Sequence, residues 1–288
     1  MKTRIISALV GTVILLAVLF CPYTWVFVAA AAALAAIAVW ELLHNTGVVN
    51  NKLFLMISLV FSAAQVIACA NAVENSQHVF MLNSPLTLWL YIMRMLPLLL
   101  LALYALLALV FFVVHRRTFV CKGFGLTVYA TLGFAALACL RLAPSVFGLP
   151  FVMLPLVIAW MSDTGAYFVG TFFGKHKMAP VTSPKKSWEG FFGGWVISIG
   201  LTSVFGLICN AFIAPMSSLR IKVGLITVFA AVLAPLSVLG DLFASLIKRR
   251  FGIKDYGNIM PGHGGVMDRF DSVIFIAPLL WVLLELFH

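Results

Sequence analysis

The stretch VAAAAALAAIAVW, residues 28–40, contains no charged residue and is typical of the whole chain. Of the 288 residues, 63% are apolar and only 10% are charged, and the mean hydropathy is +1.11. Soluble domains are about 45–50% apolar and about 25% charged. Because a bilayer core takes about 20 apolar residues in a helix, these recurrent apolar runs predict an all-α integral membrane protein.

The apolar runs predict about nine transmembrane helices. Their expected ranges are 5–20, 24–43, 53–72, 87–114, 124–141, 149–173, 190–213, 223–247 and 270–287. We expect the first to be an uncleaved span and not a signal peptide, because it lacks a small-x-small cleavage site. No soluble-sized segment separates the runs, so the chain is expected to be one continuous membrane domain.

The basic residues predict how the chain is oriented. With the N-terminus in the cytosol, 15 of the 19 Lys and Arg residues fall on the cytosolic side. Arg141, Arg220 and Lys222 fall outside, and Arg94 lies within a span. Short loops rich in Lys and Arg stay cytosolic, which predicts an N-in, C-out topology. The net charge of +10 is thereby explained, and no nucleic-acid partner is expected.

The acidic residues need a second explanation. Six of the nine lie in predicted cytosolic loops or cytosol-facing helix ends of the C-terminal half: Asp163, Glu189, Asp241, Asp255, Asp268 and Asp271. Carboxylates near a membrane are costly, so a functional site is the default hypothesis. We therefore expect residues 1–145 to form scaffold helices and residues 146–288 to carry the chemistry.

The first candidate cluster is WMSDTGAYFVGTFFG, residues 160–174. Asp163 lies about three helical turns before the predicted cytosolic end, so it must face a polar cavity or a cation, or pair structurally with one basic side chain. Gly170 and Gly174 indicate close helix packing. A phosphate-binding P-loop is excluded, because only three residues separate these glycines and His176 replaces Ser or Thr.

The second cluster is the loop KHKMAPVTSPKKSWEG, residues 175–190. Two prolines stop helices here, and Glu189 is favourably placed at the start of the next span. Lys185 and Lys186 are therefore expected at the bilayer surface beside a helix start, where phosphate binds readily. Binding of anionic lipid headgroups alone explains the same lysines, and both interpretations stay open at this point.

The third cluster lies around the eighth and ninth spans and includes PGHGGVMDRFDS, residues 261–272. Asp241 precedes the end of one span, while Asp268 and Asp271, spaced i, i+3, share a face at the start of the next. Three carboxylates from two helices suit a hard cation such as Mg²⁺. A purely structural role as helix-end acids does not explain Asp241. Nearby basic residues suited to phosphate are Lys248, Arg249, Arg250, Lys254 and Arg269.

Acidic and basic residues clustered at a cytosolic surface indicate phosphoryl or nucleotidyl transfer to a lipid. His263 is a candidate base or phosphate hydrogen-bond donor. An ion or metabolite transporter is disfavoured. It would need carboxylates near the midplane and access from both faces, whereas these acids cluster toward one side. A CDP-alcohol phosphotransferase is disfavoured because its DG and AR pattern is absent, whereas a CTP-dependent polyprenol or dolichol kinase has similar chemical needs.

The third cluster resembles the signature of phosphatidate cytidylyltransferase, also called CDP-diacylglycerol synthase. SDTGAYFVG and SPKKSWEG resemble two further motifs of that family, in the expected order, although Ser187 stands where the family more often has Thr. The resemblance covers about residues 160–272. The matching residues of the signature are Ser245, Lys248, Arg249, Lys254, Asp255, Gly257, Pro261, His263, Gly264, Gly265, Asp268, Arg269 and Asp271.

The resemblance implies a reaction of CTP with phosphatidate that yields CDP-diacylglycerol and pyrophosphate. It also implies Mg²⁺, with a second cation such as K⁺ possible, a homodimer, and a bacterial inner membrane with the active site facing the cytosol. The implied metal ligands are Asp241, Asp268 and Asp271. The catalytic candidates are these three with Asp163, Lys185 and Lys186. The substrate-binding candidates are Ser183, Glu189, Lys248, Arg249, Lys254, His263, Gly264, Gly265 and Arg269.

Overall fold

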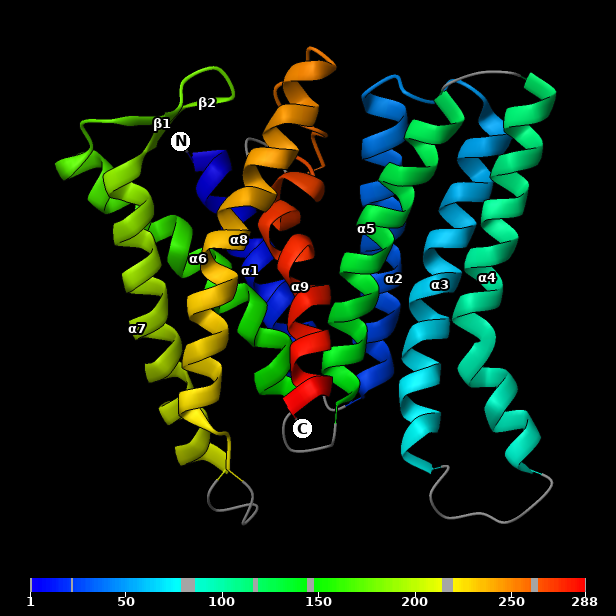
Figure 1. Cartoon of the computed structure of the whole chain (residues 1–288), viewed down its shortest axis with the longest axis horizontal. Helices are drawn as coiled ribbons and strands as arrows, with labels where there is room; N and C mark the ends of the chain where they lie inside the picture. Colours follow the sequence, from blue (N-terminus) through cyan, green and yellow to red (C-terminus); the bar gives the residue numbers. More distant parts are fainter. Residues whose placement is uncertain are drawn as a thin grey trace. The chain divides into compact units, whose positions relative to one another are not determined.

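The computed structural model describes residues 2–21, 23–78, 86–115, 119–143, 148–213, 220–259 and 264–287. Within these ranges the chain forms nine α-helices, one π-helix and one two-stranded hairpin (Figure 1). The chain divides into two compact units. Unit 1 comprises Met1–Ala143 with Ile253–Arg269, and unit 2 comprises Pro144–Gly252 with Phe270–His288. The division falls inside the last helix.

Each predicted helix is found in the described part of the chain. The helices before residue 144 are α1 (Lys2–Leu19), α2 (Thr24–Trp40), α3 (Lys52–His78), α4 (Leu86–His115) and α5 (Phe119–Leu142), and the π-helix η1 (Glu41–Asn45) continues α2. The remaining helices are α6 (Gly148–Phe173), α7 (Trp188–Ile213), α8 (Val223–Arg250) and α9 (Met267–Phe287). The all-α prediction is thus confirmed.

Eight of these helices, within the described residues, are long and apolar enough to cross a bilayer. In α1 the qualifying apolar segment, Leu9–Leu19, is shorter. The chain is therefore a polytopic helical membrane protein. Its N-in, C-out orientation stays a prediction.

Residues 177–187 are not the plain loop that we predicted. They contain β1 (Lys177–Ala179) and β2 (Ser183–Ser187), which pair antiparallel with an irregular register. The backbone N–H of Trp188 donates to the carbonyl of His176 at 3.0 Å and closes the base of this hairpin. The hairpin therefore joins the end of α6 to the start of α7.

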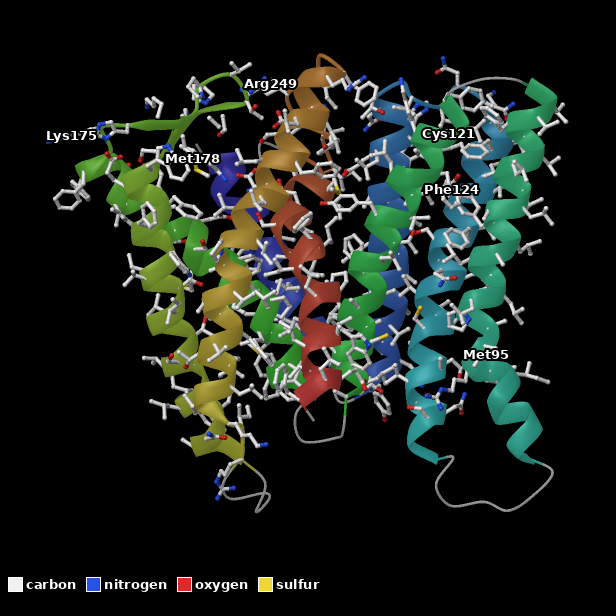
Figure 2. The ribbon with its side chains drawn as sticks, viewed as in Figure 1. Met95, Cys121, Phe124, Lys175, Met178 and Arg249 are labelled. Atoms are coloured by element: carbon white, nitrogen blue, oxygen red, sulfur yellow. The ribbon has the colours of Figure 1, made fainter. Side chains whose placement is uncertain are left out.

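The core of unit 1 is centred on Tyr104 of α4, which is 1% exposed. Its ring stacks on Phe61 of α3, with centroids 4.1 Å apart, and on Phe124 of α5 at 5.3 Å. The Tyr104 hydroxyl lies 2.9 Å from the Ser58 hydroxyl. Offset aromatic pairs and a satisfied hydroxyl let one residue join three helices in an apolar environment. Figure 2 labels Phe124 on α5.

The close packing of α6 on α7 in unit 2 depends on small residues. Gly165 faces the backbone of Gly194, and Gly170 faces the backbone of Gly190. Ser198 Oγ donates to the carbonyl of Ile158 at 2.9 Å and also joins these helices. Small residues let helices in membranes approach closely, which agrees with the packing predicted from Gly170.

We expect Gly194→Ala to destabilise unit 2. A Cβ at Gly194 would meet the carbonyl oxygen of Ser162 and would lie 2.8 Å from the backbone nitrogen of Ala166. Overpacking of this kind typically costs about 1–3 kcal/mol. Thermal unfolding of the detergent-purified protein should show a lower Tm.

The matched control is Gly200→Ala on the same helix, where an added Cβ meets nothing within 4 Å. It should leave stability unchanged or raise it by up to about 1 kcal/mol, because Ala favours helix more than Gly. An equal loss of Tm in both variants would contradict the packing role of Gly194.

Candidate functional site

The chemistry-bearing residues of unit 2 gather at one end of its helices. The hairpin, the end of α6, the start of α7 and the end of α8 lie together there (Figure 1). Figure 2 labels Lys175 near the hairpin and Arg249 at the end of α8. Residues that are distant in sequence are thereby placed on adjoining elements.

An ion pair joins the hairpin to α8. Lys186 Nζ lies 2.6 Å from Asp241 Oδ2, and the two side chains are 21% and 27% exposed. Ser245 Oγ, one turn further along α8, donates to Asp241 Oδ1 at 3.4 Å. Since both charged groups are partly withdrawn from solvent, each depends on the other for neutralisation.

Two more carboxylates interact electrostatically with this pair. Asp163 on α6 interacts with Lys186 and Asp241. Asp271 on α9 is 9% exposed and interacts with Asp241, Asp163 and Lys248. The backbone N–H of Ser272 donates to Asp271 Oδ1 at 2.7 Å. We call the five residues Asp163, Lys186, Asp241, Lys248 and Asp271 the acid–base cluster.

The two adjacent lysines of β2 differ in exposure. Lys185 is exposed, while Lys186 is half-buried and pairs with Asp241. The strand ends at Ser187, which is 6% exposed and accepts the N–H of Gly190 at 3.2 Å as an N-cap of α7. Ser183, at the start of β2, is half-buried.

Glu189 lies at the base of the hairpin. Its Oε1 is 2.6 Å from His176 Nδ1, and its carboxylate also accepts the backbone N–H of His176 at 3.2 Å. The sequence pattern did not identify His176 as a partner. The contact indicates that Glu189 orients the hairpin. This role does not depend on whether Glu189 also contacts a substrate.

In unit 1, Asp268 is bound by backbone groups of the preceding loop. Its Oδ2 accepts the N–H of Tyr256 at 2.7 Å and the N–H of Gly265 at 3.0 Å. Gly264 has φ +87°, a left-handed conformation that favours glycine, and a Cβ there would lie 2.9 Å from the same oxygen. Lys254 and Arg269 are exposed.

Two residues in the N-terminal half were not predicted to belong near any site. Glu41 of η1 is 0% exposed and accepts the N–H groups of Val266 and Met267, at the start of α9. Asn45 Nδ2 donates to the carbonyl of Tyr256 at 2.6 Å. The only sequence signal was an isolated acid directly after a long apolar run.

The predicted site residues thus fall into three groups. Asp163, Lys186, Asp241, Lys248 and Asp271 come together in the acid–base cluster, and Ser183, Lys185, Glu189 and Arg249 lie on the same elements or at the start of α7. Lys254, Gly264, Gly265, Asp268 and Arg269 belong to unit 1. His263 lies outside the described residues.

A divalent cation suits the chemistry of these donors. Among the described residues, no three His, Cys, Asp or Glu side chains converge closely enough to ligate one ion. Mg²⁺ usually takes only one or two carboxylates and completes its shell with waters and substrate phosphates. Asp241 and Asp271 interact and offer such hard oxygen donors. The larger set with Asp268 draws on both units and stays a prediction.

The fold and these clusters define a class: a multi-spanning helical membrane protein with carboxylates and lysines gathered at helix ends. The model of the cytidylyltransferase family matches residues 2–287. The chain therefore belongs to the cytidylyltransferase family.

Curated relatives agree with this membership. Phosphatidate cytidylyltransferase of Bacillus subtilis (strain 168) is 45% identical over 141 residues, which cover 49% of each chain. The proteins of the same name from Staphylococcus epidermidis (strain ATCC 12228 / FDA PCI 1200) and Staphylococcus aureus (strain COL) are 45% and 42% identical over 137 and 142 residues. The chain spans about half the length of the curated relatives it matches, with 49% or 50% of each relative covered.

Lys186→Met should destabilise unit 2, because it leaves Asp241 unpaired beside Asp163 and Asp271. Removing one partner of a partly buried charge pair costs about 1–3 kcal/mol. Thermal unfolding in detergent should show this loss, and the double variant Lys186→Met/Asp241→Asn should recover part of it.

Lys185→Met is the matched control, since this neighbouring lysine is exposed. Its effect should stay within about 0.5 kcal/mol. Strictly additive losses in the double variant would show that the Lys186–Asp241 pair contributes nothing to stability.

Proposed function

We propose that this chain transfers CMP from CTP to phosphatidate, giving CDP-diacylglycerol and pyrophosphate. The observation that carries the proposal is the acid–base cluster, found in a membrane chain that belongs to the cytidylyltransferase family. The relatives named phosphatidate cytidylyltransferase support the choice of substrate.

The proposed reaction needs no nucleophile from the protein. A phosphate monoester has a second pKa of about 6, so phosphatidate is largely dianionic at neutral pH. One of its oxygens forms a bond to the α-phosphorus of CTP, and the bond from that phosphorus to the pyrophosphate oxygen breaks. The protein then has to position two polyanions and neutralise their charge.

The acid–base cluster offers both functions. Lys186 and Lys248 supply positive charge for phosphate groups, while the carboxylates beside them, of the same sign as phosphate, need a cation between them and the substrate. Asp241 and Asp271, with Asp268 as a further ligand, would hold Mg²⁺. When bound, Mg²⁺ would neutralise phosphate oxygens and stabilise the leaving pyrophosphate. A second cation such as K⁺ would add further positive charge.

The remaining substrate contacts follow from the family resemblance. Lys185, Arg249, Lys254 and Arg269 would meet phosphate charge, and Ser183 and Gly264 would supply hydrogen bonds. Gly265, whose N–H donates to Asp268, would let the backbone pass close to the substrate. His263 would complete the substrate site. We further propose a bacterial inner-membrane location, a cytosol-facing site and a homodimer, since CTP is cytosolic and the phosphatidate headgroup lies at that interface.

A product assay tests the proposal. Detergent-purified protein is incubated with CTP, Mg²⁺ and either phosphatidate or a polyprenol, and the products are identified by mass spectrometry. Pyrophosphate with CDP-diacylglycerol is expected. CDP with a phosphorylated alcohol would instead identify a CTP-dependent lipid kinase and overturn the proposal.

Asp241→Asn should lower kcat/KM at least about 100-fold, because the amide lacks the charge that holds the cation and the paired lysine. Steady-state kinetics at saturating Mg²⁺ measure the loss, and the Tm shows that the variant is folded. Glu74→Gln on α3, outside the proposed site, should keep kcat/KM within about twofold. Near-normal turnover by Asp241→Asn would exclude its proposed role.

A further inference from the structure

Glu41 is a fully buried carboxylate in the half of the chain that was predicted to be scaffold. It opens the π-helix η1, is 0% exposed, and is followed by Leu42 and Leu43, which are also 0% exposed. Withdrawing an ionised carboxylate from water costs several kcal/mol unless charged or hydrogen-bonding groups compensate it. The contacts of Glu41 must therefore account for its burial.

Those contacts are the backbone N–H groups of Met267, the first residue of α9, and of Val266 directly before it. Val266 N–H donates to Glu41 Oε1 at 3.0 Å, and Met267 N–H donates to Oε2 at 2.8 Å. The first N–H groups of a helix lack partners within the helix and attract negative charge. Glu41 thus caps α9 from 225 residues earlier in the chain.

Two glycines make room for this carboxylate. A Cβ on Gly257 or on Gly265 would collide with Glu41 Oε1. Neither glycine has the positive φ that itself calls for glycine, so close approach of the backbone explains them. We call residues 264–267 the capping turn, since it carries the N–H groups bound by Glu41.

The same turn holds Asp268. Gly265 N–H donates to Asp268 Oδ2 at 3.0 Å, and Tyr256 N–H donates to that oxygen at 2.7 Å. The carbonyl of Tyr256 in turn accepts a hydrogen bond from Asn45 Nδ2 at 2.6 Å. Both donors to Asp268 are therefore fixed by η1, one through Glu41 and the other through Asn45.

The contacts of Glu41 and Asp268 are not an efficient way to stabilise the fold. Glu41 and Asp268 are close enough to repel each other electrostatically. Apolar side chains of similar volume would often stabilise a buried site as well as or better than buried charges. A π-helical turn is also rare and frequently marks a functional site. Costly local features are expected where a side chain must be held in position.

We propose that Glu41 is a positioning residue, whose buried carboxylate fixes the capping turn and through it the orientation of the Asp268 carboxylate. The proposal rests on the proposed function in one respect: Asp268 is taken as a ligand of the cation that binds with CTP. The contacts of Glu41 with the capping turn stand independently of that reaction.

Hydrogen exchange of the full chain in detergent tests the first step. Glu41→Gln keeps the side-chain shape but turns one amide N–H group toward a backbone N–H donor. The amides of Val266 and Met267 should exchange at least about tenfold faster, while α3 and α7 exchange as before. Glu74→Gln is the matched control and should change neither region. Unchanged exchange in the capping turn would overturn the proposal.

Cation dependence tests the second step. In Glu41→Gln, the Mg²⁺ concentration for half-maximal activity should rise about tenfold, with the KM for phosphatidate within about twofold. A merely structural role would lower the amount of active protein and leave the Mg²⁺ dependence unchanged. Faster exchange with a normal Mg²⁺ dependence would therefore refute positioning of Asp268.

A double-mutant comparison separates the route through Asp268 from other routes. Binding of CTP in the presence of Mg²⁺ is measured by calorimetry for Glu41→Gln, Asp268→Asn and the double variant. If Glu41 acts through Asp268, adding Glu41→Gln to Asp268→Asn should change Kd by less than about twofold. A further tenfold weakening would contradict the proposal.

A second variant and the wild-type activity distinguish the possible outcomes. If Glu41→Gln does not fold, Glu41→Asp keeps the charge, shortens the side chain by one methylene, and should give the same changes at smaller amplitude; no change in either measurement would overturn the proposal. If the wild-type chain makes no CDP-diacylglycerol, the proposed function fails. Normal wild-type activity with unaltered Glu41→Gln would remove the positioning role alone.

Discussion

A carboxylate among apolar helices must be compensated by N–H donors or by a cation. The arrangement of the polar groups in this chain follows from that constraint. Unit 1 meets Glu41 with two helix-end N–H groups. Unit 2 meets Asp241 with the ammonium group of Lys186. Helix ends are where unused N–H groups and long basic side chains are both available. Chemistry is therefore concentrated at helix ends, while the spans between them need only pack.

The helices were predictable because each long apolar run became one helix, as residues 28–40 did within α2. The ends were less predictable because capping decides them. α9 starts at Met267, not near residue 270, and the Met267 N–H donates to Glu41 there. The extension of α8 to Arg250 places three basic residues in its last turn. The hairpin was not predicted because its short strands carry Pro184 and three lysines and show no apolar alternation.

The sequence predicted which residues belong to the candidate site better than which of those residues lie together. Scarcity of charge in an apolar chain was enough to single out Asp163, Asp241 and Asp271. The sequence could not show which of these carboxylates interact, because that depends on how α6, α8 and α9 pack. The role of Glu41 was not predicted, because its partners lie more than 200 residues away in the sequence. Nothing in the neighbouring sequence distinguishes it from an acid at the end of a span.

The glycines before α9 have a more specific meaning in the structure than in the sequence. A tight glycine loop suggests backbone N–H groups that cradle a bound anion. Here the N–H groups of Tyr256, Gly265, Val266 and Met267 already donate to the chain's own carboxylates, Asp268 and Glu41. These four donors are therefore not free for a substrate phosphate. Under the proposed function, phosphate charge must be met by basic side chains and by the cation, and the loop acts by fixing a carboxylate that binds that cation.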